Sequence, residues 1–355
     1  MSKARKSNIE LLRIVAMMLI VLHHLCKYAY PGNASVEVET VCNLLLLGGK
    51  IGVNIFVLIS GYFLASGRIK LESMLRVLFE AWFYSLVLGL VCALLFQNNF
   101  SPKDFLKSFL PTNDGLPWFV TAYLGMYLVA PWLSKLSSTL SQSQFKQMLV
   151  VGFCVFSLVP TLTGCMFVTN DFSWFCFLFL IACYICKFGF STCIAKRMFI
   201  GGGGFLMASV FIGELICAEF PAVHVPITYF ANMHTVPTLF ASMGLFCIFN
   251  DLKIPTLKSI NVIAQGSFGV YLIHENTFVR ELLWQNFGFV FSGGIVSEVL
   301  LALSATICIY LVLTGVDLIR SQVFEKPLFG LLQDRFETLF NRSDAVLNGI
   351  TVVNK

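Results

Sequence analysis

Apolar stretches of about transmembrane length recur along the whole chain. A helix crosses the roughly 30 Å hydrocarbon layer of a bilayer with about 20 apolar residues. Because the stretches are continuously apolar and do not alternate with polar residues, they predict helices and not the strands of a barrel. The predicted spans are residues 9–27, 43–65, 77–96, 118–134, 148–166, 172–190, 199–217, 227–249, 261–280 and 295–318. The pattern predicts an all-α polytopic membrane protein with about ten transmembrane helices.

Composition agrees with this fold class and excludes others. Hydrophobic residues make up 57% of the 355 residues and charged residues 12%, against about 45–50% and about 25% in ordinary soluble domains. So few charges cannot cover the surface of a soluble protein, and a chain this apolar does not stay disordered. The net charge of +5 is explained by membrane topology, so we expect no nucleic-acid partner.

The distribution of basic residues predicts the orientation of the spans. Lys and Arg concentrate in cytoplasmic loops of membrane proteins. With both termini cytoplasmic, eighteen of the 24 Lys and Arg residues fall in inside segments and five outside, and Arg13 lies within a span. The first span also carries His23 and His24 and lacks a small-residue cleavage site, so it is a retained helix and not a signal peptide.

Two segments of different character follow from the same pattern. Residues 1–318 form the predicted membrane-embedded domain, and residues 319–355 form a cytoplasmic tail. Apolar residues recur in the tail among charges, which predicts an amphipathic helix along the inner membrane surface. The twelve Cys lie mostly in or beside apolar spans, as small packing residues do. No Cys or His has the spacing of metal ligands, so we expect no metal site.

The first span carries the densest set of polar residues. Arg13 and His24 are eleven residues apart, which is about 16 Å along a helix and returns nearly to the same face. Arg suits phosphate binding, and His suits proton abstraction near neutral pH. Arg13 can also be read as a headgroup anchor, and His24 as a packing residue.

Other polar residues lie at bilayer depth, where ionisable side chains are costly and often functional. In the ninth span His274 stands beside Glu275, and this pair favours a functional polar pocket over packing. Ser60 is more typical of close helix packing. Trp118, with Tyr123 a turn further in, begins the fourth span, where aromatic belt residues are common.

Four short segments then occur in a fixed order: Leu12-Arg13-Ile14-Val15-Ala16 followed by His24; Asn54-Ile55-Phe56 followed by Ser60-Gly61-Tyr62-Phe63-Leu64; Trp118-Phe119; and Tyr271-Leu272-Ile273-His274. Together they resemble the acyltransferase-3 family of integral membrane acyltransferases, which O-acylate bacterial surface glycans and related acceptors. The chain departs from the family pattern at Ser73, where many members have Arg, and at Asn54, where many have Asp.

The resemblance implies an O-acetyltransferase of polysaccharide biosynthesis in the bacterial plasma membrane. The donor would be acyl-CoA, most often acetyl-CoA, bound as a substrate and not as a tightly held cofactor. The acceptor would be a hydroxyl of a cell-surface glycan or of its lipid-linked precursor. The alternatives are a polytopic transporter or flippase for a glycan-related substrate, which also places ionisable residues in spans, and a membrane scaffold.

Residue roles follow from the resemblance and from the charge map together. We expect His24, His274 and Glu275 to be catalytic, with His24 as general base or as the carrier of a transient acyl group. We expect CoA phosphates to meet the basic residues of the inner face, which are Arg13, Arg68, Lys70 and Arg76. The pantetheine arm would then follow one face of the first helix to His24. Residues expected in the pocket wall are Asn54, Ser60, Trp118 and Tyr123.

Overall fold

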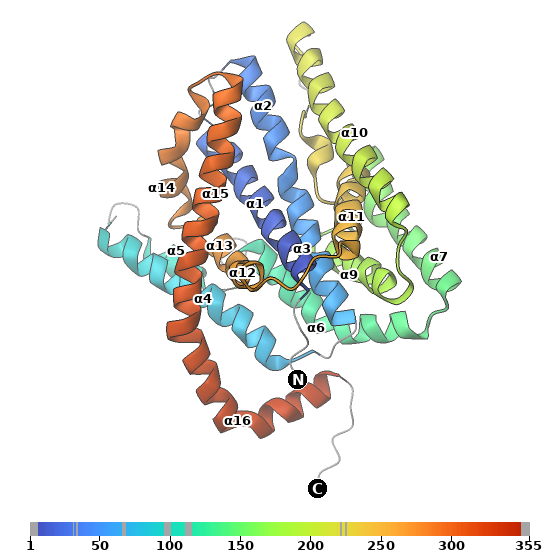
Figure 1. Cartoon of the computed structure of the whole chain (residues 1–355), viewed down its shortest axis with the longest axis vertical. Coiled ribbons are helices and arrows are strands. Elements are labelled where there is room, and N and C mark those ends of the chain that lie inside the picture. Colours follow the sequence, from blue (N-terminus) through green and yellow to red (C-terminus); the bar gives the residue numbers. More distant parts are fainter. Residues whose placement is uncertain are drawn as a thin grey trace.

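The computed structural model describes residues 6–30, 32, 35–65, 69–95, 101–110, 116–220, 222–223 and 226–348. These residues form helices and connecting turns, and no strand occurs among them (Figure 1). The α-helices are α1 (Ser7–Ala29), α2 (Val36–Leu46), α3 (Gly48–Ala65), α4 (Leu71–Leu95), α5 (Pro102–Lys107), α6 (Trp118–Thr139), α7 (Gln142–Phe153), α8 (Val159–Thr163), α9 (Asp171–Phe188), α10 (Thr192–Glu219), α11 (Val236–Asp251), α12 (Lys258–Ile263), α13 (Ser267–His274), α14 (Arg280–Trp284), α15 (Ile295–Arg320) and α16 (Lys326–Leu347). The all-α membrane fold is therefore as predicted.

Seven helical segments of the described chain are long and apolar enough to cross a membrane. They are Ser7–Ala29, Val36–Ala65, Leu71–Leu95, Gln142–Thr163, Asp171–Phe188, Thr192–Glu219 and Ile295–Leu347. The other three predicted spans are also largely helical. The fourth corresponds to α6, which contains Pro131. The eighth corresponds to α11, which has only 16 residues.

The ninth predicted span is not one continuous helix. It is divided into α12, a 3₁₀ turn over Ala264–Gly266, and α13, which ends at His274. Irregular backbone at membrane depth is tolerated where protein surrounds it or where it lines a cavity. Both conditions hold here, because α13 packs against α1, α4 and α15 and Gln265 lines a cavity.

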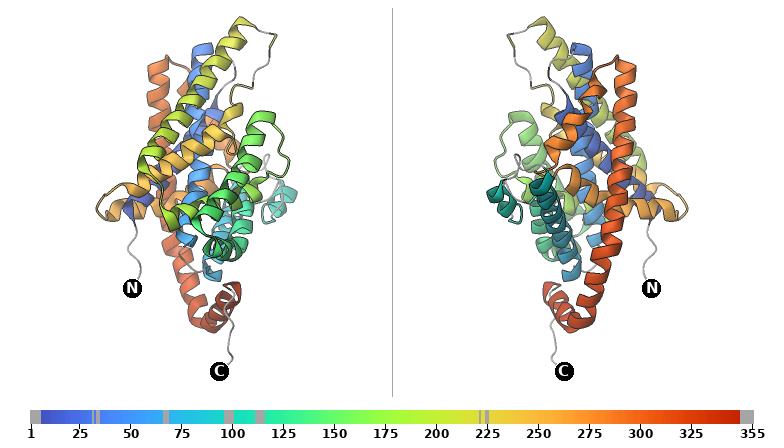
Figure 2. Two further views of the ribbon diagram at one scale, coloured as in Figure 1. Left: turned by 90° about the vertical axis from the view of Figure 1, so that its right-hand side faces the viewer. Right: turned by 90° about the vertical axis from the view of Figure 1, so that its left-hand side faces the viewer.

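Helix α1 lies in the middle of the molecule and packs against α2, α3, α11, α12, α13 and α15 (Figures 1 and 2). Its contact with α3 is close because α3 offers glycines there. A Cβ on Gly52 would lie 2.5 Å from the carbonyl oxygen of Ala16, and one on Gly49 would lie 2.3 Å from the His23 ring. Small residues permit such close approach between membrane helices. The packing fixes the rotation of α1 and so decides which face its polar residues present.

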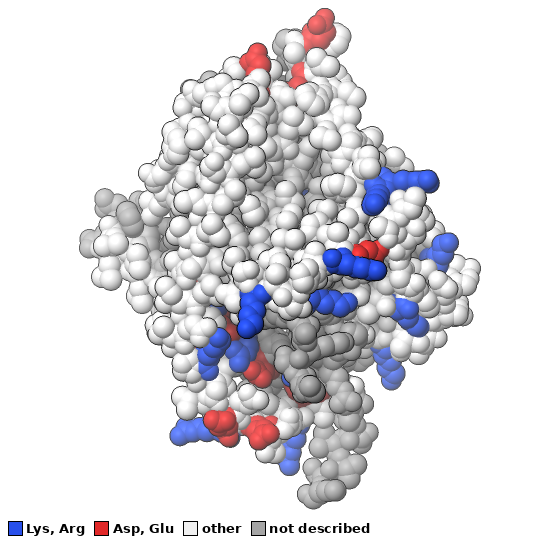
Figure 3. Space-filling view, in the orientation of Figure 1, with Lys and Arg blue, Asp and Glu red and all other residues white. Residues whose placement is uncertain are grey.

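Charged side chains are distributed unevenly along the molecule. On the face shown in Figure 3, Lys and Arg lie mostly in the lower half, toward the end where both chain termini are drawn in Figure 1. We call this the inner end, because the sequence predicts it to be cytoplasmic, and the opposite end the outer end.

The C-terminal segment continues directly from the membrane domain. Helix α15 runs through a π-helical turn, Ser321–Glu325, into α16, so the predicted boundary at residue 318 falls inside a helix. Figures 1 and 2 show α16 turning away below α15. The carboxylate of Asp344 accepts a hydrogen bond from the Leu71 amide at 2.7 Å, which ties α16 to the start of α4. An amphipathic helix on the membrane surface stays a prediction.

Arg320 joins three elements at the inner end. Its guanidinium lies 2.7 Å from Asp317 on α15, 2.7 Å from Glu325 and 3.3 Å from Glu80 on α4, and the residue is only 4% exposed. Replacing Arg320 by Met would leave buried carboxylates without a counter-charge, so we expect the free energy of unfolding to fall by about 3 kcal/mol. Thermal unfolding in detergent measures this loss. Arg335→Met is the matched control, because Arg335 is exposed on α16; equal melting temperatures for the two variants would contradict the assignment.

Candidate active site

One face of α1 connects the inner end of the molecule with the outer end. Arg13, Met17, Ile20, His24 and Tyr28 follow one another at spacings of three or four residues, which keeps them on one side of a helix. Since α1 is continuous over these residues, Arg13 and His24 share a face as their spacing predicts.

His24 forms a pair with a histidine from a distant part of the chain. Its Nδ1 lies 2.9 Å from Nε2 of His274 on α13. The other nitrogen of His274, Nδ1, lies 2.6 Å from the carbonyl oxygen of Val270. A carbonyl only accepts, so Nδ1 of His274 carries the proton and its Nε2 is an acceptor. His24 therefore donates from Nδ1, and with both rings uncharged its Nε2 holds a free lone pair.

Glu275 lies next to this lone pair. Its Oε1 is 3.6 Å from Nε2 of His24, which is too long for a direct hydrogen bond. Oε1 is buried without a hydrogen-bond partner among the described residues, while Oε2 lies 4.0 Å from Arg280. A proton gained by His24 at Nε2 would face this carboxylate. His24, His274 and Glu275, which the sequence singles out separately, thus form one cluster.

Aromatic rings hold the two imidazoles in place. Tyr28 stacks on His24 with ring centroids 5.7 Å apart. Tyr271 and Trp284 present their rings edge-on to His274 at 6.0 and 5.9 Å. His274 is fully buried, and the His24 side chain retains 13% exposure. The pair is therefore rigidly placed, with His24 as the member open to other molecules.

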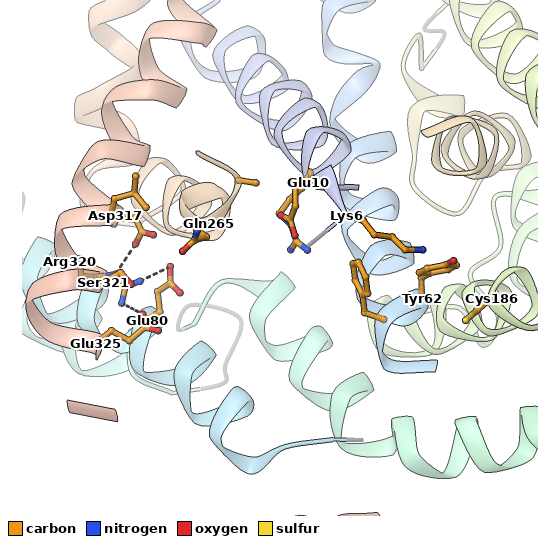
Figure 4. A pocket seen from close by; sticks show the side chains of 14 residues that line it. Lys6, Glu10, Tyr62, Glu80, Cys186, Gln265, Asp317, Arg320, Ser321 and Glu325 are labelled. Carbon is orange, nitrogen blue, oxygen red and sulfur yellow. Dashed lines mark hydrogen bonds and ion pairs between the residues drawn. The ribbon is translucent and has the colours of Figure 1, made fainter. Parts of the chain in front are cut away.

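A cavity of about 660 Å³ lies at the inner end of the same α1 face (Figure 4). Its lining residues are Lys6, Glu10, Arg13, Tyr62, Phe63, Glu80, Cys186, Ala264, Gln265, Asp317, Leu318, Arg320, Ser321 and Glu325. Figure 4 shows Arg320 and its carboxylate partners on one side, Lys6 and Tyr62 on the other, and Glu10 between them. Arg13 contacts Glu10 at 3.2 Å, and Lys6 lies over the Tyr62 ring at 5.3 Å. The cavity is polar and carries both signs of charge.

Of the four basic residues predicted to meet CoA phosphates, the three that the structure describes are not brought together. Arg13 lines the cavity, but Arg76 does not and instead pairs with Glu72 and Glu325 at 2.7 and 2.9 Å. Lys70 is exposed and also lies outside the lining. Arg68 falls outside the described residues.

Lys6 and Arg320 line the cavity instead. Sequence reasoning counted both only as signals of topology. The sequence feature that could have singled out Arg320 is its spacing of three residues from Asp317, at the end of the tenth predicted span.

Asn54 serves packing between helices. Its Nδ2 donates to the Met233 carbonyl at 2.8 Å, and its Oδ1 accepts from Trp174 Nε1 at 2.9 Å. The residue is fully buried. Both halves of its amide are thus occupied, and the predicted place in a substrate pocket does not follow from the geometry.

The other predicted pocket residues lie between the inner cavity and the outer end. The Ser60 side chain faces the Tyr123 hydroxyl, and the Tyr123 ring stacks on Phe119 at 5.9 Å. Trp118 stands at the start of α6, with Lys50 Nζ 4.8 Å from its ring centre. Of these residues, Trp118 and Phe119 line a further small cavity.

This small cavity stands between the inner cavity and His24. Its volume is about 20 Å³, and it is lined by Met17, Ile20, Val53, Phe56, Trp118, Phe119, Phe268 and Tyr271. That is room for about one water molecule. The expected continuous route along α1 is therefore closed here, because apolar side chains fill it. A donor arm from the inner cavity reaches His24 only when these side chains move.

Among the described residues, no three His, Cys, Asp or Glu side chains lie close enough to hold a metal ion.

The chain is a polytopic helical protein with an imidazole pair in its membrane domain and a polar cavity at its inner end. The chain belongs to the acyltransferase-3 family, because residues 6–315 match the acyltransferase domain that defines it. It is thus a membrane acyltransferase. The match extends from the start of α1 into α15 and leaves α16 outside. No curated protein and no solved structure matches the chain.

Proposed function

We propose that this acyltransferase moves an acetyl group from acetyl-CoA to a hydroxyl of a cell-surface glycan, or of its lipid-linked precursor, in the bacterial plasma membrane. The observation that carries the proposal is the His24–His274 hydrogen bond of 2.9 Å. This bond leaves the lone pair of His24 Nε2 directed away from His274 and next to Glu275. A base held in one tautomer by a second group is the arrangement that activates a hydroxyl for acyl transfer.

The inner cavity supports an anionic, cytoplasmic donor. Arg13 and Lys6 line it on the side of α1 and α3, and Arg binds phosphate by charge-assisted hydrogen bonds. Arg320 is already paired with three carboxylates, so it is less available to a phosphate. The pantetheine arm would follow the α1 face past Met17 and Ile20, over the roughly 16 Å that separates Arg13 from His24.

In the chemical step His24 acts as general base and then as general acid. Nε2 takes the proton of the acceptor hydroxyl as the hydroxyl oxygen bonds to the thioester carbon. The imidazolium that forms is stabilised by the Glu275 carboxylate, 3.6 Å away. When the tetrahedral intermediate collapses, the carbon–sulfur bond breaks and the Nε2 proton passes to the CoA sulfur. The products are an ester on the glycan and free CoA thiol. Direct attack of Nε2 on the thioester would use the same lone pair.

Release of CoA thiol tests this function against transport. Protein purified in detergent is supplied with acetyl-CoA, with and without surface glycan purified from the producing cells. The proposal predicts thiol release that depends on the glycan. A flippase or transporter would release no thiol with or without the glycan, and that result would reject acyl transfer.

Substitutions of Arg13 and Arg76 test which of these two residues binds the phosphates of the donor. Arg13→Ala is expected to raise the KM for acetyl-CoA about tenfold, because it removes a charge-assisted hydrogen bond to phosphate. Arg76→Ala should leave this KM unchanged, since Arg76 pairs with Glu72 and Glu325 and does not line the cavity. Initial rates at varied acetyl-CoA concentration give the KM of each variant. An unchanged KM in Arg13→Ala would return Arg13 to the role of a headgroup anchor.

A further inference from the structure

A second polar cavity lies on the outer side of the imidazole pair. Its volume is about 290 Å³, and it is lined by Tyr28, Arg280, Glu281, Trp284 and Gln285. Tyr28 stands four residues beyond His24 on α1, so this cavity and the inner cavity lie on opposite sides of His24. Neither the fold nor the donor chemistry described above uses it.

Each member of the imidazole–carboxylate cluster touches a residue that lines this outer cavity. Tyr28 stacks on His24 at 5.7 Å, and Trp284 meets the His274 ring edge-on at 5.9 Å. Arg280 lies 4.0 Å from Glu275 and 5.1 Å from the centre of the Tyr28 ring. His24, His274 and Glu275 do not themselves line the cavity, so a molecule held there would be separated from the base by the side chains that do.

Two buried polar atoms, one on a residue that lines the cavity and one on a residue of the cluster, have no hydrogen-bond partner among the described residues. One is the indole Nε1 of Trp284, a donor, and the other is Oε1 of Glu275, an acceptor. Trp284 is fully buried, and a buried indole N–H normally finds a partner. A ligand that carries several hydroxyl groups can both accept from the indole and donate to the carboxylate.

We propose that the outer cavity is the acceptor site and binds one sugar residue of the glycan, an inference that rests on the proposed function. The planar polar groups of Arg280, Glu281 and Gln285 suit neighbouring sugar hydroxyls, because each offers paired donors or acceptors. Stacking on Tyr28 is less favoured, since His24 and Arg280 already pack against its ring. The sugar is thus recognised mainly through hydrogen bonds, and one of its hydroxyls reaches His24 Nε2 when the lining side chains next to His24 move.

This placement separates the two substrates. The donor occupies the inner cavity, and the acceptor enters from the outer end. The acyl group is transferred from the donor to the acceptor at His24, between the two cavities. The outer site can therefore be altered without changing the binding of the donor.

Two substitutions test the acceptor site. Trp284→Phe keeps a ring against His274 but removes the indole N–H, and Gln285→Ala removes a side chain that is exposed at the cavity. Each is expected to raise the KM for purified surface glycan about three- to tenfold, the loss of one hydrogen bond, with the KM for acetyl-CoA unchanged. Asn286→Ala is the matched control, because Asn286 is the exposed neighbour of Gln285 and does not line the cavity.

The outcomes separate this proposal from the proposed function. If the wild-type protein transfers acetyl groups and neither variant changes the KM for glycan, the outer cavity is not the acceptor site. If the KM for acetyl-CoA rises in its place, the cavity serves the donor and the assignment is wrong. If the wild-type protein transfers nothing to the glycan, the proposed function fails and the acceptor site with it. Should Trp284→Phe not fold, Gln285→Ala and its control give the answer alone.

Discussion

His24→Ala is expected to lower kcat for acyl transfer by about a hundredfold to ten-thousandfold, the contribution of a positioned general base. The protein should still insert and fold. Nε2 of His24 carries the free lone pair of the imidazole pair. The group next to this nitrogen is the Glu275 carboxylate, so no other imidazole is in place to replace His24 as the base. Steady-state transfer to glycan measures the loss, and gel filtration in detergent checks the fold.

His23→Asn is the matched control for this substitution. His23 neighbours His24 on α1, but its Nδ1 donates to the Leu46 carbonyl at 2.8 Å and its ring packs against Gly49 of α3. Asn can supply a similar donor, so His23→Asn should keep most of the activity. Full activity in His24→Ala, or equal loss in both variants, would remove His24 from the chemistry.

His274→Ala is expected to lower kcat by about a hundredfold or more, although His274 does not itself touch the acceptor. Its Nε2 holds the proton of His24 on Nδ1, and the Val270 carbonyl holds His274 in the matching tautomer. Without this partner His24 can rotate or take the other tautomer, in which Nε2 is protonated and cannot act as a base. Kinetics with acetyl-CoA and glycan give the size of the effect.

The double variant distinguishes a coupled pair from two separate residues. Because the two imidazoles act as a unit, His24→Ala/His274→Ala should be no slower than His24→Ala alone. If the two losses multiply, each histidine acts independently, and the tautomer argument fails.

Much of the site along α1 follows from helical periodicity. The eleven-residue spacing places Arg13 and His24 on one face because an α-helix repeats its faces at that interval. The cost of ionisable groups in a bilayer also marks His274 and Glu275. Their contact with His24 could not be predicted, since it joins residues 250 positions apart and depends on how α13 packs against α1.

The residues that line the inner cavity were harder to predict for a related reason. The sequence places Lys70 and Arg76 near the start of a span, but it does not give the direction in which their side chains point. The structure turns Arg76 toward Glu72 and Glu325, while Arg320 from the far end of the chain lines the cavity. Asn54 likewise has the right depth, but its amide is used by Met233 and Trp174.

The closed passage between Arg13 and His24 could not be predicted from the sequence either. Residues such as Met17 and Phe56 read as ordinary apolar positions of a span, and only the structure shows that they pack with residues of α6 and α13 around a cavity of about 20 Å³. Met is flexible enough to repack around a ligand. Donor binding is thus expected to couple to side-chain movement in this region.

Transfer of radiolabelled acetyl from acetyl-CoA to purified surface glycan is the most direct measurement of the central claim, compared between the wild-type protein and His24→Ala in liposomes. The claim predicts base-labile label on the glycan with the wild-type protein and only background label with the variant. Absence of labelled glycan in both, or the same rate of labelling in both, would contradict it.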